Sequence, residues 1–328
     1  MADEQPFDCL DDQGRLLRGV QTGQPTGRDG RGLLLLNAGL LPRYGYHRHH
    51  VKGARLLAAQ GIPVLRLDLP GVGDSAGELP EGPVEERWRE IELGSMVPAT
   101  LAAARAWRTQ AGLAGVVLGG ACGGAITALL AAAHDPAAIA GCLAVSLPIC
   151  LSGTRRRRPD ARPTPRDDDA PGPLHPQRAR QLLAGYLPRL GSPTAWRRLL
   201  TGRSDLPGIL RALRALLRQG WSARRAGRGD RPPADDRLNP LLVPALRTIV
   251  AARVPLRLVL GGLAPETDDF RRYLARPILE REPALAAGLQ QHLVPRADHT
   301  FADPEDERLL WQEAASWIRL RCSPPGAP

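Results

Sequence analysis

One turn in the first half of the chain decides the fold: residues 116–126 read VVLGGACGGAI. The apolar start predicts a strand and the small apolar residues after it predict a helix, so Cys122 falls on the sharp turn between them. In a glycine-x-nucleophile-x-glycine turn one side chain is exposed, and residues as small as Gly120 and Gly124 let strand and helix approach closely. The helix N-terminus behind the side chain stabilises negative charge and favours a thiolate. The turn therefore predicts a nucleophile at Cys122; the alternative is a small buried cysteine that only packs.

Strand and helix patterns alternate around this turn. The predicted strands are two hairpin strands and a buried run within residues 7–36, and the segments 63–68, 116–118, 140–149, 254–260 and 292–294. The predicted helices are 48–60, 84–107 with interruptions at Gly94 and Pro98, 125–133 and 305–320. This alternation is typical of a mostly parallel sheet with helices on both faces, so we expect an α/β fold.

The alternation stops between residues 151 and 240, where the composition changes. This segment holds 20 Arg and 8 Asp with no Lys or Glu, so its formal charge is +12 and the rest of the chain carries −2. Residues 151–175 are rich in charge and proline and indicate an exposed loop, whereas 177–221 has helical spacing. We expect a core of residues 1–150 and 241–328, interrupted by an Arg-rich loop and a helical lid in 151–240.

Composition and charge narrow the function classes. The Arg-rich charge indicates either a solvated surface or a site for an anionic partner, and nucleic acid is disfavoured because no nucleic-acid motif accompanies it. The five cysteines are widely spaced without a CxxC pair, which disfavours a disulfide framework and a zinc site. No signal-peptide pattern is visible, and no apolar run is long enough to span a bilayer. We therefore expect a cytoplasmic protein with no metal, no cofactor and no membrane span.

A second serine-centred pattern competes with the Cys122 turn. Residues 73–77 fit G-x-S-x-G around Ser75, and residues 71–76 fit a dinucleotide-binding fingerprint that ends in alanine. Both motifs require a following helix, but residues 76–83 read AGELPEGP, which is too rich in glycine and proline to form one. The segment is therefore predicted to be a turn-rich loop after a strand.

The candidate general base is His299, in the stretch Arg296-Ala297-Asp298-His299-Thr300-Phe301. It follows the last predicted strand and precedes the last predicted helix, well after the nucleophile in chain order. The alternative is a surface histidine without a catalytic role. Asp298 is adjacent to His299 in the sequence and is badly placed to orient its ring.

On these residues the chain resembles the α/β-hydrolase superfamily, and more narrowly the hydrolases encoded beside exosortase-type protein-sorting systems. The resemblance covers most of the core, and its matching segments are 37–48, 68–77, the Cys122 turn, 297–301 and, within the insertion, 186–202. It implies an α/β-hydrolase fold with a cysteine in the nucleophile position.

The resemblance also implies an acid after the strand at 256–260, but the chain departs from the family pattern there. Similar proteins place an Asp about two residues beyond a glycine, and Ala264 occupies that position here. Glu266 is the candidate that reaches His299 from a shifted loop, whereas Asp268 and Asp269 are predicted to cap a following helix. A thiol depends less on this third group than a hydroxyl does, so a Cys–His dyad is the alternative.

We therefore expect a hydrolase that acts on a small-molecule acyl ester or thioester. Cys122 attacks the acyl carbon, His299 relays the proton, and the oxyanion rests on the backbone N–H of Gly123 and of Gly39 or Leu40. The arginines of the insertion are expected to hold an anionic carrier such as coenzyme A or acyl carrier protein.

Two further functions remain open from the sequence. An acyltransferase uses the same Cys–His site and differs only in the acceptor of the acyl group. A catalytically inactive ligand-binding relative is suggested by Ala264, and the second oxyanion donor is open because Asn37 stands where many relatives have a histidine.

Overall fold

The computed structural model describes residues 3–25, 30–79, 81–152 and 237–322. The chain divides into two units, residues 1–154 with 236–328 and residues 155–235, and the described residues belong to the first. The predicted helices of 177–221, and the predicted loop at 151–175 beyond its first two residues, lie outside the described residues. The lid assignment therefore stays a prediction.

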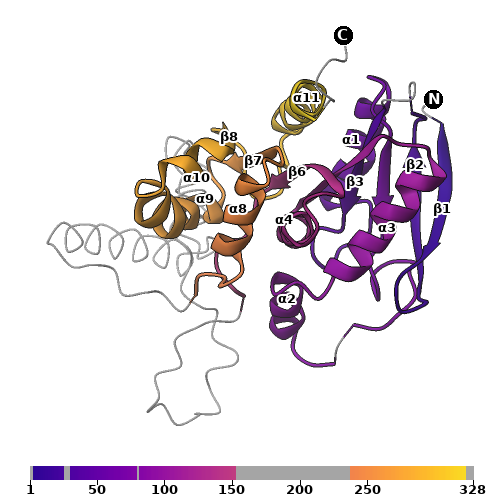
Figure 1. Ribbon diagram of the computed structural model, residues 1–328, viewed down its shortest axis with the longest axis horizontal. Helices are drawn as coiled ribbons and strands as arrows, with labels where there is room; N and C mark the ends of the chain where they lie inside the picture. Colours follow the sequence, from indigo (N-terminus) through magenta and orange to yellow (C-terminus); the bar gives the residue numbers. More distant parts are fainter. Residues whose placement is uncertain (1–2, 26–29, 80, 153–236, 323–328) are drawn as a thin grey trace, which may run out of the picture. The chain divides into compact units, whose positions relative to one another are not determined.

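An eight-stranded sheet runs through the first unit (Figure 1). Its strands are β1 (Glu4–Leu10), β2 (Leu16–Thr22), β3 (Arg31–Leu36), β4 (Val64–Leu67), β5 (Gly115–Ala121), β6 (Ile139–Val145), β7 (Leu256–Gly261) and β8 (Leu289–Val294). The spatial order is β1-β2-β4-β3-β5-β6-β7-β8. β2 pairs antiparallel with both β1 and β4, and the other pairings are parallel. The predicted mostly parallel α/β sheet is confirmed.

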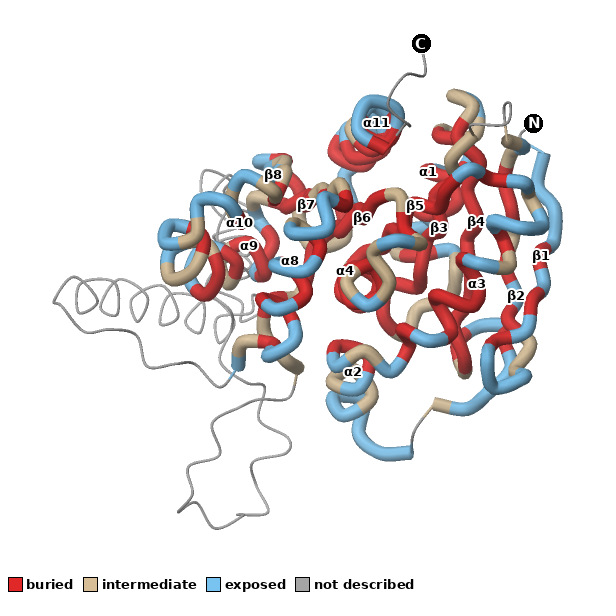
Figure 2. Tube along the Cα trace, viewed as in Figure 1, coloured by how far each residue is buried: buried red, intermediate tan, exposed pale blue. Residues whose placement is uncertain are grey.

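Helices cover both faces of the sheet, which explains why the central strands are continuous apolar runs (Figure 2). Side chains alternate between faces along β3. Leu34 and Leu36 lie in one apolar cluster with α3 (Val97–Gln110), α4 (Gly123–His134) and α8 (Leu242–Ala251). Leu33 and Leu35 lie in the other cluster with α1 (His49–Ala58) and α11 (Pro304–Arg321).

The shorter helices lie mostly at the ends of strands. They are η1 (Tyr46–Arg48), α2 (Val84–Glu92), α9 (Pro265–Asp269), the π-helical η3 (Phe270–Leu279) and α10 (Pro283–Gly288). The break predicted near Gly94 separates α2 from α3. Among the described residues, no helix is long and apolar enough to cross a bilayer.

One prediction about a helix start holds for the position but not for the capping bond. Asp268 and Asp269 were expected to cap the helix that contains Phe270, and Asp269 is the N-cap residue of that helix, η3, but it has helical backbone angles and makes no side-chain capping hydrogen bond. The preceding helix α9 begins at Pro265 with Ala264 as its N-cap residue and ends at Asp269. Proline is favoured in the first helical turn because it needs no N–H donor there. Both aspartates therefore lie inside a helix, and the residues before them, including Glu266, are lifted into its first turn.

Candidate active site

Cys122 lies on the turn between β5 and α4, with φ 52° and ψ −120°. Residues other than glycine rarely adopt this backbone conformation, and close packing around the turn holds Cys122 in it. A Cβ on Gly124 would lie 2.4 Å from the Asn37 carbonyl oxygen, and one on Gly120 would lie 2.6 Å from the Gly124 carbonyl carbon. The two glycines thus allow the strand and the helix to approach as the sequence predicts. The Cys122 thiol is half-buried and free of any disulfide.

His299 follows β8 and lies between Cys122 and a carboxylate. Its Nδ1 is 2.8 Å from Oε1 of Glu266, and the Cys122 thiol is close enough to the ring to raise the pKa of His299. Burial lowers the pKa of His299, but the hydrogen bonds and charges of Cys122 and Glu266 outweigh burial and raise it to about 10. At neutral pH the ring is therefore an imidazolium that faces a sulfur on one side and a carboxylate on the other.

Glu266 is the second residue of α9, directly after β7. Its side chain is 9% exposed, compared with 31% for His299. The first turn of α9 is tied to the strand, because the Thr267 hydroxyl donates to the Gly261 carbonyl at 2.7 Å. This geometry brings the Glu266 carboxylate to the His299 ring, although Ala264 occupies the position where similar proteins have an Asp.

The loop that carries His299 is fixed by contacts from both sides. The Ser146 hydroxyl, at the end of β6, donates to the His299 carbonyl at 3.0 Å. The Asp298 carboxylate accepts the N–H of Thr300 at 2.9 Å and that of Ala302 at 3.2 Å. Asp298 therefore shapes the turn, and the ring is oriented by Glu266 instead.

Tyr46 is a site residue that the sequence argument did not assign. Its ring meets the His299 ring edge-on, with centroids 5.8 Å apart and planes at 70°. Burial, followed by the charge and the hydrogen bond of Cys122, raises the pKa of the Tyr46 hydroxyl. The available signal was its position within the segment 37–48 that carries the family resemblance.

Two backbone segments meet beside Cys122. A Cβ on Gly123 would lie 2.7 Å from the Gly39 Cα, so the α4 N-terminus and the loop after β3 are in direct contact. The Gly39 N–H donates to the Asn37 carbonyl at 2.8 Å. In the described part of the chain, the N–H groups of Gly123 and Leu40 have no hydrogen-bond acceptor. Of the two predicted alternatives for the second oxyanion donor, Leu40 is thus the available one.

The Asn37 side chain holds this loop against the loop after β4. Its amide nitrogen donates to Asp68 Oδ1 at 3.0 Å and its oxygen accepts the Leu69 N–H at 2.6 Å. Asp68 is fully buried and also accepts the Arg43 N–H at 2.6 Å. Asn37 therefore helps to fix the backbone of the loop after β3, which lies beside Cys122.

Ser75 has a structural role in the same loop. Its hydroxyl donates to the Asp68 carbonyl at 2.6 Å and accepts the Arg18 N–H at 2.8 Å, and the residue is 9% exposed. The loop around it contains no helix, in agreement with the sequence analysis.

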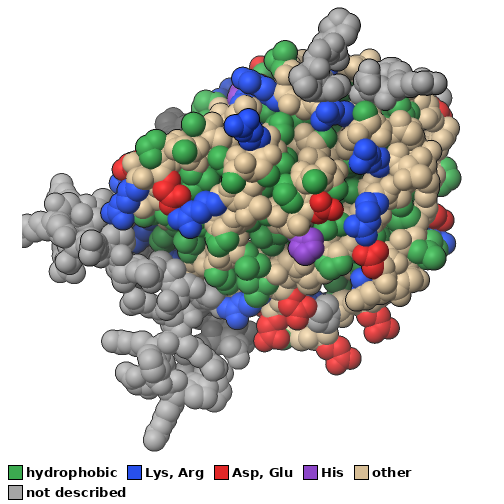
Figure 3. Space-filling view, in the orientation of Figure 1, with side chains coloured by type: hydrophobic (Ala, Val, Ile, Leu, Met, Phe, Trp, Pro, Cys, Tyr) green, Lys and Arg blue, Asp and Glu red, His purple; other side chains and the backbone are tan. Residues whose placement is uncertain are grey.

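The described residues contain no group of three or more His, Cys, Asp or Glu side chains that could hold a metal ion. On the face shown in Figure 3, Lys and Arg side chains are scattered among apolar ones and form no continuous basic stripe.

Comparisons with known proteins assign the chain to a family. Residues 33–310 match a family model described as the alpha/beta hydrolase family. No curated protein sequence matches significantly. An esterase from Pyrococcus furiosus superposes with a TM-score of 0.54 at 11% identity, covering 98% of this chain and 92% of the other. A dienelactone hydrolase from Anabaena variabilis gives 0.50 at 16% identity, with 97% of both chains covered. DcsB, solved with a substrate analogue, gives 0.52 at 13% identity, covering 97% of this chain and all of the other. At these identities the solved structures show the shared fold, and the family match over most of the chain establishes that this protein is a hydrolase of the alpha/beta hydrolase family.

Proposed function

We propose that the chain is a cysteine-dependent hydrolase of acyl esters or thioesters, with Cys122 as nucleophile, His299 as acid–base and Glu266 as the group that orients His299. The observation that supports this assignment is the position of the His299 ring, whose Nδ1 is 2.8 Å from the Glu266 carboxylate and whose pKa is raised by both Glu266 and Cys122. Nucleophile, base and orienting acid in this order are what acyl transfer requires.

In the first half-reaction the Cys122 thiolate attacks the acyl carbon and the carbonyl π electrons move to its oxygen. The N–H groups of Gly123 and Leu40 donate to this oxyanion, since neither has another acceptor among the described residues. The intermediate collapses to an acyl-cysteine, and the imidazolium of His299 gives its proton to the departing alkoxide or thiolate. The leaving group departs as a neutral alcohol or thiol.

In the second half-reaction His299 is neutral and accepts a proton from water, which attacks the acyl-cysteine. The second tetrahedral intermediate expels the thiolate, and the acid product leaves. His299 is then an imidazolium again, and Glu266 holds its ring toward Cys122 throughout.

We further propose that the leaving group is carried by coenzyme A or acyl carrier protein, held by the Arg-rich insertion 151–240, which also forms the lid. The support for an anionic carrier is the +12 formal charge of that segment. We also propose that the chain belongs to the hydrolases encoded beside exosortase-type systems, which its sequence segments resemble, and that it is located in the cytoplasm.

The test compares p-nitrophenyl esters with acyl-coenzyme A thioesters that carry the same acyl groups. Wild type should turn over at least one series, and intact-mass spectrometry of quenched samples should detect an acyl adduct on Cys122. Cys122→Ala should abolish both signals, whereas Cys150→Ala, at another half-buried cysteine, should keep them. An adduct on another residue, or turnover by Cys122→Ala, would refute the assignment. Adding an amine or alcohol acceptor distinguishes an acyltransferase, because acyl transfer would then outpace hydrolysis.

A further inference from the structure

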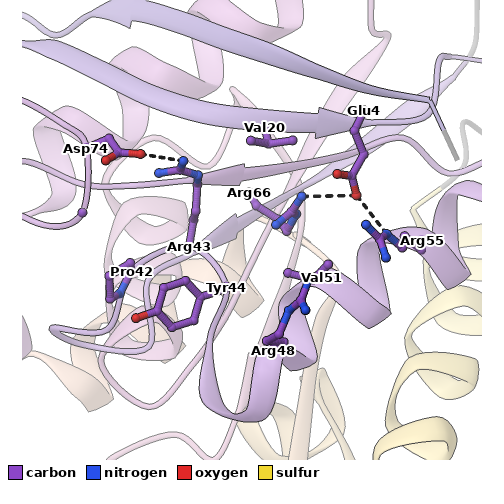
Figure 4. Close-up of a pocket in the computed structure, with 11 residues that line it drawn as sticks. Glu4, Val20, Pro42, Arg43, Tyr44, Arg48, Val51, Arg55, Arg66 and Asp74 are labelled. Atoms are coloured by element: carbon purple, nitrogen blue, oxygen red, sulfur yellow. Dashed lines mark hydrogen bonds and ion pairs between the residues drawn. The ribbon is translucent and has the colours of Figure 1, made fainter.

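A pocket of about 690 Å³ lies among β1, β2, β4, α1 and the loops after β3 and β4, and is lined by none of Cys122, His299 and Glu266. Its charged lining residues come from β1, β4, η1 and α1 and from the loops after β3 and β4 (Figure 4). They are Arg43, Arg48, Arg55 and Arg66, with the carboxylates Glu4 and Asp74. Ligand pockets of small organic molecules have volumes in this range.

The four arginines are unequally compensated. Arg43 pairs with two carboxylates, buried Asp68 and exposed Asp74. Arg55 and Arg66 share one carboxylate, Glu4, at 3.0 and 3.5 Å. Arg48 has no acidic partner in the described part of the chain, and Figure 4 shows it without an interaction to the other residues drawn. Three guanidinium groups thus face a single carboxylate.

Arg66 is a charged residue at a position in the sheet where an apolar residue is expected. It lies in β4, a strand inside the sheet, and is 5% exposed. Its Nε has no hydrogen-bond partner, although burying such a donor unpaired is unfavourable. Burial lowers the pKa of the Arg66 guanidinium; Glu4 opposes this shift, and the charges of Arg43, Arg55 and Arg48 add to it. A buried cation that shares its one carboxylate with Arg55, has an unpaired Nε and is repelled by neighbouring guanidinium groups is what an anion would stabilise.

The backbone presents Arg48 to this pocket at a conformational cost. Arg48 has φ 60° and precedes α1, and His47 before it has φ 47°. Two successive left-handed residues that are not glycine are uncommon, and strain of this kind gathers at ligand clamps and active sites. Tyr44, whose side chain is 47% exposed, and the apolar Val20 and Val51 supply a surface for an organic group.

We propose that this pocket binds the phosphate of an organic phosphomonoester, with Arg48 and Arg66 as its guanidinium contacts and Tyr44 beside its organic part. A dianionic phosphate matches two uncompensated positive charges, and guanidinium groups pair with phosphate oxygens through two parallel hydrogen bonds. The pocket is larger than a phosphate ion requires, so the ligand extends over the apolar residues. This inference is independent of the chemistry at Cys122.

The test is isothermal titration of the full chain with adenosine 5′-monophosphate, inorganic phosphate, adenosine and citrate, at two salt concentrations. We expect adenosine monophosphate to bind most tightly, inorganic phosphate weakly, and both more weakly at high salt because charge pairs are screened. Adenosine and citrate should bind at least tenfold more weakly than the monophosphate. Equal binding of citrate would overturn the assignment to phosphate, and equal binding of adenosine would overturn the role of the arginines.

The matched variants are Arg48→Gly and Arg253→Gly. Both arginines are exposed with left-handed backbones, at φ 60° and 58°, so glycine relieves strain equally at each site. Arg48→Gly should fold normally and weaken adenosine monophosphate binding roughly ten- to a hundredfold, the loss expected for a hydrogen bond to a charged group. Arg253→Gly should leave binding unchanged. No saturable binding by wild type, or the same affinity in Arg48→Gly, would refute the proposal.

Discussion

Glu266→Gln provides the sharpest test of the site, because it removes one charge and keeps the shape of the side chain. The pKa of His299 is about 10, against an ordinary value of 6.5. That difference corresponds to roughly 5 kcal/mol in favour of the imidazolium, shared between Cys122 and Glu266. His299 is 31% exposed, so solvent screening reduces the figure. A charge-assisted hydrogen bond of 2.8 Å contributes about 1.5–3 kcal/mol of it.

The variant should therefore lower the pKa of His299 by roughly one to two units. The folded pKa is raised above that of a solvated histidine, so the imidazolium stabilises the fold fully below about pH 6.5 and this stability is lost as pH rises through about 10. The alkaline limb of kcat/KM should lie near pH 10 in wild type and move toward neutrality in Glu266→Gln. Turnover at pH 7 should fall about ten- to a hundredfold, because the ring also loses its orientation.

The measurement is a nuclear magnetic resonance titration of labelled histidine side chains, with the His299 signal assigned by its absence in His299→Gln. The pH profile of thioester hydrolysis, corrected for the uncatalysed reaction, is recorded on the same samples. Asp298→Asn is the matched control, since that carboxylate binds backbone N–H groups of the turn and not the ring. If His299 titrates identically in wild type and Glu266→Gln, or titrates near pH 7 in wild type, the reasoning about the site is wrong.

Three further predictions test neighbouring parts of the structure. Tyr46→Phe keeps the ring against His299 but removes the hydroxyl whose pKa Cys122 raises. The kcat should therefore fall about fivefold to thirtyfold with little change in melting temperature, whereas Tyr44→Phe should leave kcat unchanged. Burial lowers the pKa of His49 to about 4, so the fold keeps its full stability above pH 6.5, where the ring is neutral, and its free energy of unfolding should drop by roughly 3 kcal/mol between pH 6.5 and 4. Urea unfolding at each pH measures this drop, and a free energy that does not change with pH contradicts the prediction. Gly124→Ala places a Cβ 2.4 Å from a carbonyl oxygen, so the free energy of unfolding should drop by about 2 kcal/mol or more, and a drop below about 0.5 kcal/mol would show that the turn relaxes easily.

The Cys122 turn and the position of His299 were predictable because their signals are local. A strand, a glycine-flanked residue and a helix occupy eleven consecutive positions, and His299 follows a strand at the expected distance. Glu266 was a candidate only, because its reach depends on where α9 begins. Pro265 and the Thr267 hydroxyl set that start, and neither fact is visible as a periodic pattern.

Other parts of the structure depend on contacts between distant segments. The sequence analysis assigned no element to α8, although its apolar residues Leu242, Leu246 and Ile249 have helical spacing and Pro244 is compatible with the first turn of a helix. The role of Tyr46 requires the loop after β3 to fold back over β5, and no residue near Tyr46 in the sequence indicates Cys122 as its partner.

Backbone strain provides an independent argument that the site is functional. In the described part of the chain, the residues other than glycine with positive φ are His47, Arg48, Cys122, Ser146, Arg253 and Phe301. Three of them belong to the segments that build the site: Cys122 carries the thiol, Ser146 bonds the His299 carbonyl and Phe301 lies two residues after His299. His47 and Arg48 lead into the pocket that Arg48 lines. Each such residue costs about 1–3 kcal/mol, and random drift would distribute them over the many loops. These strained residues lie on segments that are far apart in the sequence. The packing of the sheet and its helices therefore offsets the cost of the strain at the place where these segments meet. A fold that kept the Cys122 turn only as architecture would have no reason to keep the strain at Ser146, whose hydroxyl donates to the His299 carbonyl.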